Sequence, residues 1–209
     1  EELIKLPVRF GCSTEEAAAI VYRKTDMTLG AVLRDLKLLN SPEVCARIAK
    51  NLDVDLSDGD EYNAMLEDDD VEFEHAAAIL RACGKTAGDA VSAENMHEKF
   101  SSVDEVEDIF ESLSKAGFTN EEIMSGICSS DIFNDNPYAT IVQDAIEHKV
   151  PMAEIVAFLQ KENIDPDGLD DEMREAEMGI QNRIDILHGL IHAEKRPTVE
   201  ETVTAEPKA

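Results

Sequence analysis

The chain has 209 residues, of which 43% are hydrophobic, 31% are charged and only 5% are aromatic, with no tryptophan. This length allows one large domain or two small ones, each with a buried core, and the apolar content excludes a wholly disordered chain. A core built from Ala, Leu, Ile, Val and Met suits packed helices better than sheets. We therefore predict an all-α fold.

The charge is strongly one-sided, with 46 Asp and Glu against 19 Lys and Arg, a formal net charge of −27. Such a chain lacks a basic surface for phosphate groups, so we expect no direct binding to nucleic acids or anionic membranes. No apolar run reaches the roughly 20 residues of a membrane-spanning helix, so we expect no membrane insertion. The charge favours basic partners or cations.

The four cysteines are dispersed and include no C-x-x-C pair; they are Cys12, Cys45, Cys83 and Cys128. Three of them lie within apolar helical patterns, where a free thiol behaves as a small hydrophobe. This usage predicts a reduced, intracellular protein, cytoplasmic or within a viral particle.

In the first half of the chain, helix-start signals precede each apolar pattern. Ser13-Thr14-Glu15-Glu16 is a capping box that predicts a helix to about residue 24, and Ser41-Pro42-Glu43 starts another that ends near Asn51. Apolar spacing predicts further helices at about residues 28–39, 57–66, 70–83 and, more weakly, 87–99.

The second half follows the same pattern. Capping boxes at Ser102–Glu105 and Thr119–Glu122 predict two helices, and Pro137 and Pro151 predict two more. One long last helix is expected over about residues 169–195, with Ile180, Ile184, Leu187 and Ile191 as its apolar stripe. The tail 197–209 has no apolar periodicity and is predicted to be disordered.

Two helix junctions look alike, Asn51-Leu52-Asp53-Val54-Asp55 and Asn163-Ile164-Asp165-Pro166-Asp167. Neighbouring segments also match at an offset of about 106 to 112 residues, which favours an internal duplication. We predict helical unit 1 over residues 1–85, connecting helices over 86–117, helical unit 2 over 118–196 and the tail over 197–209.

Three motifs were weighed as chemical sites. The run from Asn163 to Gly168 begins like a calcium-binding EF-hand loop, but Arg174 stands where that loop requires a bidentate Glu, so we interpret it as a helix–helix turn. Asp185, His188 and His192 share a helix face and are interpreted as ordinary boundary residues. Gly84-Lys85-Thr86 lacks the first glycine of a phosphate-binding loop. No metal, cofactor or catalytic residue is predicted.

We therefore predict a non-enzymatic, acidic protein-interaction module: an adaptor, a chaperone-like factor or a structural component of a larger assembly such as a virion or a secretion machine. Its partner would be a protein with a basic or amphipathic helical segment, bound in an apolar groove rimmed with carboxylates. The candidate rim residues are Asp68, Asp69, Asp70, Glu72 and Glu74 and, in the second unit, Asp170, Asp171 and Glu172. The alternatives are an acidic mimic of nucleic acid, since the charge density is comparable, and a divalent-cation-binding protein.

Overall fold

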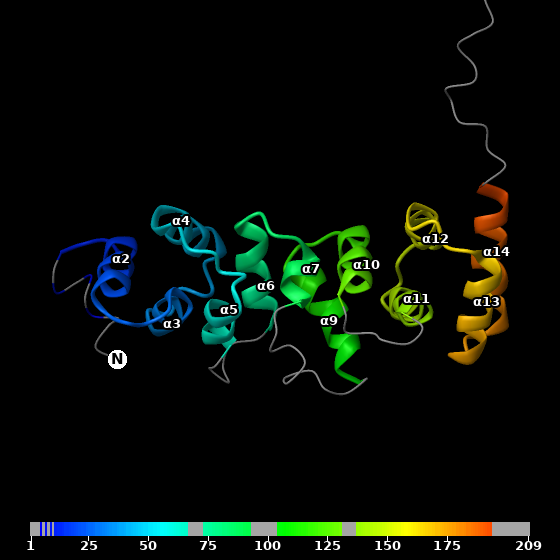
Figure 1. The fold of residues 1–209 in the computed structure, drawn as a ribbon, viewed down its shortest axis with the longest axis horizontal. Helices are drawn as coiled ribbons and strands as arrows, with labels where there is room; N and C mark the ends of the chain where they lie inside the picture. Colours follow the sequence, from blue (N-terminus) through cyan, green and yellow to red (C-terminus); the bar gives the residue numbers. More distant parts are fainter. Residues whose placement is uncertain are drawn as a thin grey trace, which may run out of the picture. The chain divides into compact units, whose positions relative to one another are not determined.

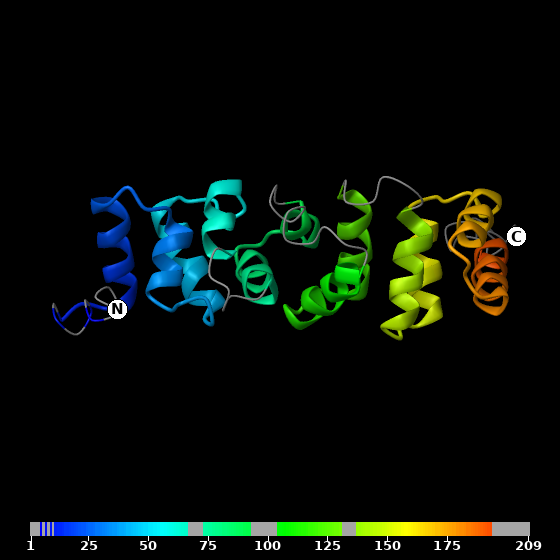
Figure 2. The same ribbon diagram turned by 90° about the horizontal axis from the view of Figure 1, so that it is seen from below.

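A computed structural model describes residues 5, 7, 9, 11–66, 73–92, 104–130 and 137–193. In these ranges the chain forms twelve helices and no strand, as the composition predicts (Figures 1 and 2). In this part of the chain no helix is both long and apolar enough to cross a bilayer.

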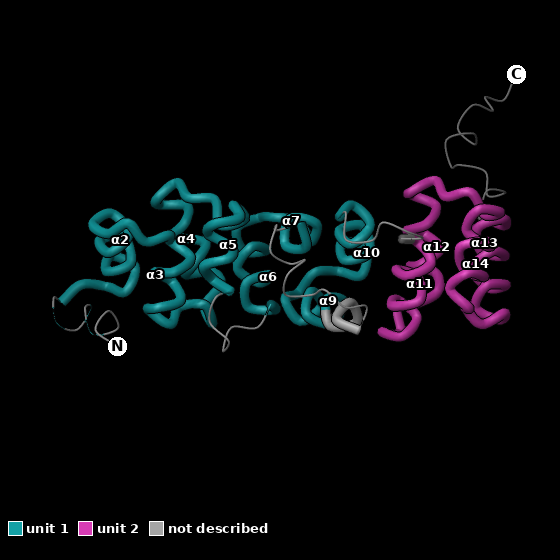
Figure 3. The backbone as a smooth tube through the Cα atoms, turned by 60° about the horizontal axis from the view of Figure 1, so that its bottom comes forward, with its two compact units in different colours: residues 1–135 teal, residues 136–209 magenta. Residues whose placement is uncertain are grey.

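Contacts divide the chain into two compact units, residues 1–135 and residues 136–209 (Figure 3). The helices of unit 1 are α2 (Thr14–Lys24), α3 (Leu29–Asp35), α4 (Pro42–Leu52), α5 (Gly59–Leu66), α6 (Phe73–Ala82), α7 (Ala87–Val91), α9 (Asp104–Lys115) and α10 (Asn120–Ser129). Those of unit 2 are α11 (Pro137–Glu147), α12 (Met152–Lys161), α13 (Pro166–Glu175) and α14 (Ile180–Ala193).

Within each unit helices pack on helices that are not their direct neighbours in the chain. In unit 1, α2 packs on α4, α4 on α6 and α6 on α9, while α3 packs on α5 and α7 on α10. In unit 2, α11 packs on α13 and α12 on α14. Each unit is therefore a stack of helical hairpins in which a hairpin contacts its neighbours, the arrangement of helical-repeat proteins.

The N-terminal caps explain where several helices begin. The capping boxes predicted at Ser13 and Thr119 are both present, with the hydroxyl accepting from the N3 amide and the N3 glutamate accepting from the cap amide. A third box joins Thr86 to Asp89 at the start of α7, where a helix was predicted from about residue 87 but its cap was not. The box predicted at Ser102–Glu105 lies largely outside the described residues.

A shared C-terminal junction explains where seven helices end. In each junction a residue with positive φ is followed by an amide that donates to the carbonyl five residues earlier, as Val54 does to Ala49 (3.0 Å) and Val150 to Ala145 (2.8 Å). Only two of these left-handed residues are glycines. The seven are Lys37, Asp53, Gly84, Gly117, Lys149, Asn163 and Glu177.

The two junctions that look alike in sequence are not equivalent in structure. The left-handed residue is Asp53, third in the first matched run, but Asn163, first in the second run. When the two runs are aligned by sequence, their left-handed residues therefore lie two positions apart. An internal duplication is not shown, and the predicted boundaries at residues 85 and 117 stay a prediction.

The single long helix predicted over residues 169–195 is wrong. Glu177 has φ 54°, and the Met178 amide donates to the Met173 carbonyl at 2.9 Å, so α13 ends and α14 begins anew at Ile180. The left-handed position holds a glutamate, and the glycine of this junction, Gly179, comes two residues later, directly before α14. The predicted disorder of 197–209 concerns residues outside the described ranges.

Small residues let two helices of unit 1 approach closely. A Cβ added to Gly126 of α10 would lie 2.6 Å from the Gly88 amide nitrogen and 2.7 Å from the Ala87 Cβ. Nearby, the fully buried Tyr62 donates its hydroxyl to the Ala90 carbonyl at 3.2 Å, which joins α5 to α7. These contacts hold α5 against α7 and α7 against α10.

Candidate functional site

Unit 1 carries a surface groove of about 1170 Å³, which we call the α4–α6 groove. It is lined by one face of α4, by the turn after α4, by the end of α6 and by the α9–α10 turn. Five alanines line it, at positions 46, 49, 78, 82 and 116. Because these side chains are small, the groove brings solvent close to the helix backbones and leaves room for side chains of another molecule.

The basic residues in this part of the sequence all lie in the lining of the groove. Between residues 38 and 98 the sequence contains four Lys and Arg residues, and all four line the groove: Arg47, Lys50, Arg81 and Lys85. Glu43, Asp53, Asp55 and Glu122 also line it. Its lining is thus balanced in charge within a chain of net charge −27, so a partner meets far less negative charge here than the composition implies.

Two of the four cations are held by carboxylates. Lys85 Nζ lies 2.7 Å from Asp55 Oδ2, and this bond is the main cause that lowers the pKa of Asp55 to about 2. The Ser57 amide and hydroxyl also donate to Asp55, at 2.9 and 2.7 Å. Arg47 donates to Glu15 of α2 at 2.6 Å and lowers the pKa of that carboxyl.

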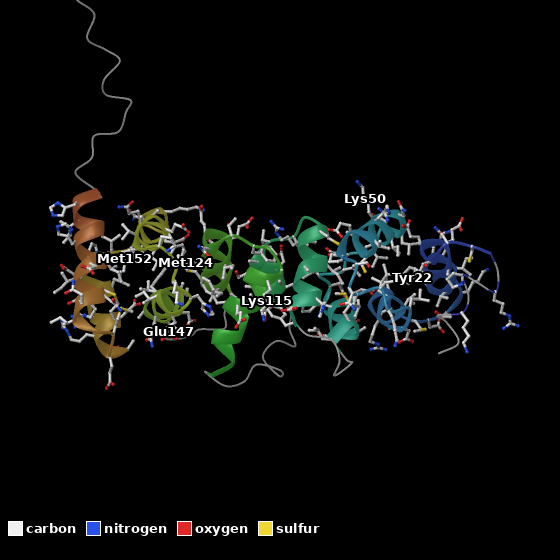
Figure 4. All side chains as sticks on the ribbon, turned by 180° about the vertical axis from the view of Figure 1, so that it is seen from behind. Tyr22, Lys50, Lys115, Met124, Glu147 and Met152 are labelled. Atoms are coloured by element: carbon white, nitrogen blue, oxygen red, sulfur yellow. The ribbon has the colours of Figure 1, made fainter. Side chains whose placement is uncertain are left out.

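The other two cations face the groove differently. Lys50, labelled in Figure 4, is exposed on α4. Arg81 is also exposed, and its guanidinium lies 5.6 Å from the ring centre of Phe118, a cation–π contact with a side chain that is itself 6% exposed. Arg81 also lies near Glu122: the backbone and side chain of Thr119 and, more weakly, the Arg81 charge lower the pKa of that carboxyl.

Cys83 and Cys45, the cysteines near the groove, have raised thiol pKa values, which disfavour nucleophilic chemistry. Burial and the Asp55 carboxylate raise the pKa of Cys83, which lines the groove, and burial raises the pKa of Cys45 to about 12. The thiolate is the nucleophilic form, so a raised pKa disfavours reaction. No histidine is among the lining residues.

The first group of predicted rim residues can be placed only in part. Asp68, Asp69, Asp70 and Glu72 lie outside the described residues. Glu74 lies in the first turn of α6, where its carboxylate is 3.6 Å from Lys115 Nζ. It does not line the α4–α6 groove.

The second group lies on α13, and two of its three members are tied into unit 2. Asp170 binds Arg174 (2.6 Å) and Arg183 (3.0 Å to Nε), which lower its pKa. Glu172 is half-buried, burial raises its pKa, and it accepts a bond from the Ala139 amide on α11. Asp171 is exposed and bonded to Arg174 at 3.1 Å. Asp170 therefore joins α13 to α14, and Glu172 joins α13 to α11.

The three motifs weighed as chemical sites have local roles. Asp165 accepts from the Gly168 amide at 3.1 Å and caps α13, so the interpretation of this run as a turn is confirmed. Gly84 is a left-handed helix end and Thr86 a cap. Asp185 accepts from Gln181 at 2.9 Å, and the rings of His188 and His192 lie 4.1 Å apart on exposed turns of α14. In the described ranges no three His, Cys, Asp or Glu side chains are placed to hold a metal ion.

The groove residues were not predicted, because the candidate rim was chosen from runs of acidic residues. A signal was present: alanines at positions 46, 49, 78 and 82 alternate with the four cations at helical spacing. A smaller hollow of about 420 Å³ lies beside it between α2 and α4, lined in part by Ser13, Ile48 and Leu52. The Arg47–Glu15 pair joins the two helices that form it.

No known protein family, curated protein sequence or solved structure matches this chain.

Proposed function

We propose that the chain is a non-enzymatic protein-interaction module, an adaptor or a component of a larger assembly, and that the α4–α6 groove of unit 1 holds a segment of its partner. The observation that carries this proposal is an alanine-lined groove of about 1170 Å³ on stacked helical hairpins. Helical stacks commonly bind partners on such surfaces, and an amphipathic helix is a frequent occupant of a groove.

The partner segment is amphipathic and carries acidic as well as apolar side chains. Its apolar side chains would cover the alanines, Val54 and Phe118, while carboxylates would reach Lys50 and Arg81. This replaces the expectation of a purely basic segment, because Asp55 is bonded to Lys85 and Glu122 caps α10. Basic side chains of the same segment would reach the other two lining carboxylates, Glu43 and Asp53. At about 0.15 M salt the Debye length is ~8 Å, so these near charges outweigh the distant acids of the chain.

The test is capture of partners from extracts of the source organism with three forms of the full chain. Ala82→Trp places a large side chain in the groove from an exposed position, and Ala157→Trp makes the same change on an exposed position of α12. We expect the parent chain and Ala157→Trp to retain the same partner in stoichiometric amount, and Ala82→Trp to lose it. Equal retention by both variants would refute the groove as the binding site.

The same capture at low and high salt separates this proposal from nucleic-acid mimicry. An apolar groove retains its partner at high salt, because only its rim contacts are screened. A mimic binds through its summed charge, so its partners would be nucleic-acid-binding proteins that leave at high salt.

A further inference from the structure

Helix α14 of unit 2 carries two apolar stripes, and the hairpin stack buries only one of them. Ile186 and Leu190 are 0% and 3% exposed, and a Cβ added to Gly189 would lie 2.7 Å from a Val156 methyl of α12. Gly189 thus lets this side of the helix approach α12 closely. The stripe that the sequence analysis took as the apolar face of the last helix points elsewhere: Ile180, Ile184 and Ile191 are 72%, 52% and 47% exposed.

The spacing of the exposed stripe is that of a coiled-coil seam. Ile180, Ile184, Leu187 and Ile191 follow one another at steps of 4, 3 and 4 residues, the alternation of d and a positions that one helix buries against another. These steps read the same from either end. An identical helix laid antiparallel would therefore place Ile180 opposite Ile191 of the partner subunit, and Ile184 opposite Leu187 of the partner subunit, in a two-fold contact.

The flanks of the seam favour a second copy over a charged partner. The positions that border it hold Gln181 and His188 on one side and Arg183 and Leu190 on the other. Arg183 is bonded to the Asp170 carboxylate of α13, whose charge Arg183 and Arg174 neutralise. Asp185 lies one position further out, bonded to Gln181. A basic helix would find no acidic rim here, whereas two chains of net charge −27 can meet at this seam without opposing their carboxylates.

We propose that α14 is a self-association site, at which two copies of this chain pair antiparallel through Ile180, Ile184, Leu187 and Ile191. The pairing uses residues of unit 2, and none of the residues that line the α4–α6 groove of unit 1 takes part in it. A dimer therefore offers two grooves to a partner that carries two copies of the bound segment, and the second binding event becomes intramolecular.

Sedimentation equilibrium of the full chain tests the pairing, over a concentration series that reaches the millimolar range. The high limit is needed because α14 supplies only about 21 Å of helix and hence a small interface. We expect a reversible monomer–dimer equilibrium. Ile184→Lys should weaken association at least about tenfold, since a lysine charge would be buried against isoleucines.

The matched control is Ile20→Lys, which makes the same change at a 56% exposed isoleucine of α2 in unit 1 and should leave the association constant unchanged. If Ile184→Lys loses helical circular dichroism, Ile180→Lys replaces it, because that side chain is more exposed. A monomer at every concentration, growth beyond the dimer, a dimer that survives the α14 variant, or equal loss in Ile20→Lys would each overturn the proposal.

Disulfide trapping tests the antiparallel direction. Chains with Ile180→Cys are mixed with chains with Ile191→Cys and oxidised, and the unsubstituted chain reports the background from the four native cysteines. We expect the mixture to form more cross-linked dimer than either variant alone. Self-linking of the separate variants at an equal or higher level means parallel helices and overturns the two-fold contact.

Discussion

At Gly126 the space that a side chain would need is already occupied by α7. The Cβ of an alanine would meet the backbone nitrogen of Gly88 and the Cβ of Ala87, neither of which can rotate away. Gly88 is constrained in turn, because its added Cβ would lie 2.8 Å from the Ser129 hydroxyl. Glycine here costs helix propensity of about 1 kcal/mol, and close packing of the two helices compensates for it.

Gly126→Ala should lower the free energy of unfolding by about 1–3 kcal/mol, the usual cost of overpacking, despite the better propensity of alanine. Urea denaturation measures it. Gly168→Ala, inside α13, is the control, since the nearest atom to its added Cβ lies 3.5 Å away, and it should not lower the free energy of unfolding. Equal effects would show that α7 and α10 do not approach as closely as described.

The Asp55 carboxylate makes a contribution to the free energy of unfolding that depends on pH. Its folded pKa is lowered to about 2, mainly by Lys85, from an ordinary value of 3.8. The carboxylate therefore stabilises the fold fully above about pH 4, and this contribution disappears as the pH falls towards 2. We expect Asp55→Asn to be less stable than the parent chain at pH 6 and the two to converge near pH 2.

Chemical denaturation of both chains at several pH values measures this difference. Asp53→Asn, two residues away, is the control, because asparagine suits the left-handed backbone of that position and Asp53 makes no ion pair among the described residues. A stability difference for Asp55→Asn that stays constant from pH 6 to pH 2 would contradict the role of the Lys85 pair.

At the scale of elements, the recurrent feature is the left-handed helix end. Five of its seven positions are occupied by residues other than glycine: Lys37, Asp53, Lys149, Asn163 and Glu177. A left-handed residue with a Cβ costs roughly 1–2 kcal/mol, although asparagine and aspartate tolerate it better. The amide of the following residue offsets this cost, because it satisfies a carbonyl at the helix end.

Lys149→Gly should therefore stabilise the chain by up to about 1 kcal/mol, after the extra chain entropy of glycine is counted. Gln143→Gly, at an exposed position inside α11, should destabilise it by about 0.5–1 kcal/mol. Thermal unfolding of both variants measures the two opposite signs. Loss of stability in Lys149→Gly would mean that its backbone is not left-handed.

Helix starts were predictable from the sequence, and several helix ends were not. Ser13, Thr119 and Pro137 mark starts through side-chain chemistry that is visible in the letters. A lysine or glutamate in the left-handed conformation cannot be recognised from its residue type. The end of α13 before Glu177 was therefore not predicted. The apolar stripe of α14 was identified correctly but assigned to the core, because periodicity does not tell which of two stripes faces a neighbouring helix.

At the scale of the whole molecule, charge opposes compaction. A net charge of −27 on 209 residues repels itself in any folded state. Raising the salt from about 0.01 M to 0.15 M shortens the Debye length from ~30 Å to ~8 Å and should raise the melting temperature. Differential scanning calorimetry in NaCl and KCl should give the same increase in both salts.

CaCl2 at matched ionic strength separates this screening from cation binding. Screening alone gives the same melting temperature as NaCl. A larger increase at micromolar to millimolar calcium would mean a specific site that binds the folded state, and would favour the alternative of a divalent-cation-binding protein.

The candidate site was less predictable than the fold because acids are too abundant to carry information. Asp170 and Glu172 turned out to join helices, and the groove is marked by four basic residues that are rare in its region. In a chain with 46 acidic and 19 basic residues, the basic residues are the better guide to a binding surface. The alanines beside it were visible, but only packing shows that α4 and α6 bring them into one groove.

The stacking of hairpins, in which α2 packs on α4, α4 on α6 and α6 on α9, gives unit 1 a mechanical property. A hairpin in such a stack is bonded to its neighbours and to little else, so the interfaces α2–α4, α4–α6 and α6–α9 lie in series. Tension on the ends of the unit would be carried by each interface in turn, and the weakest would open first. Under load the stack would lengthen one hairpin at a time, as an extensible element that yields in steps and does not break at once.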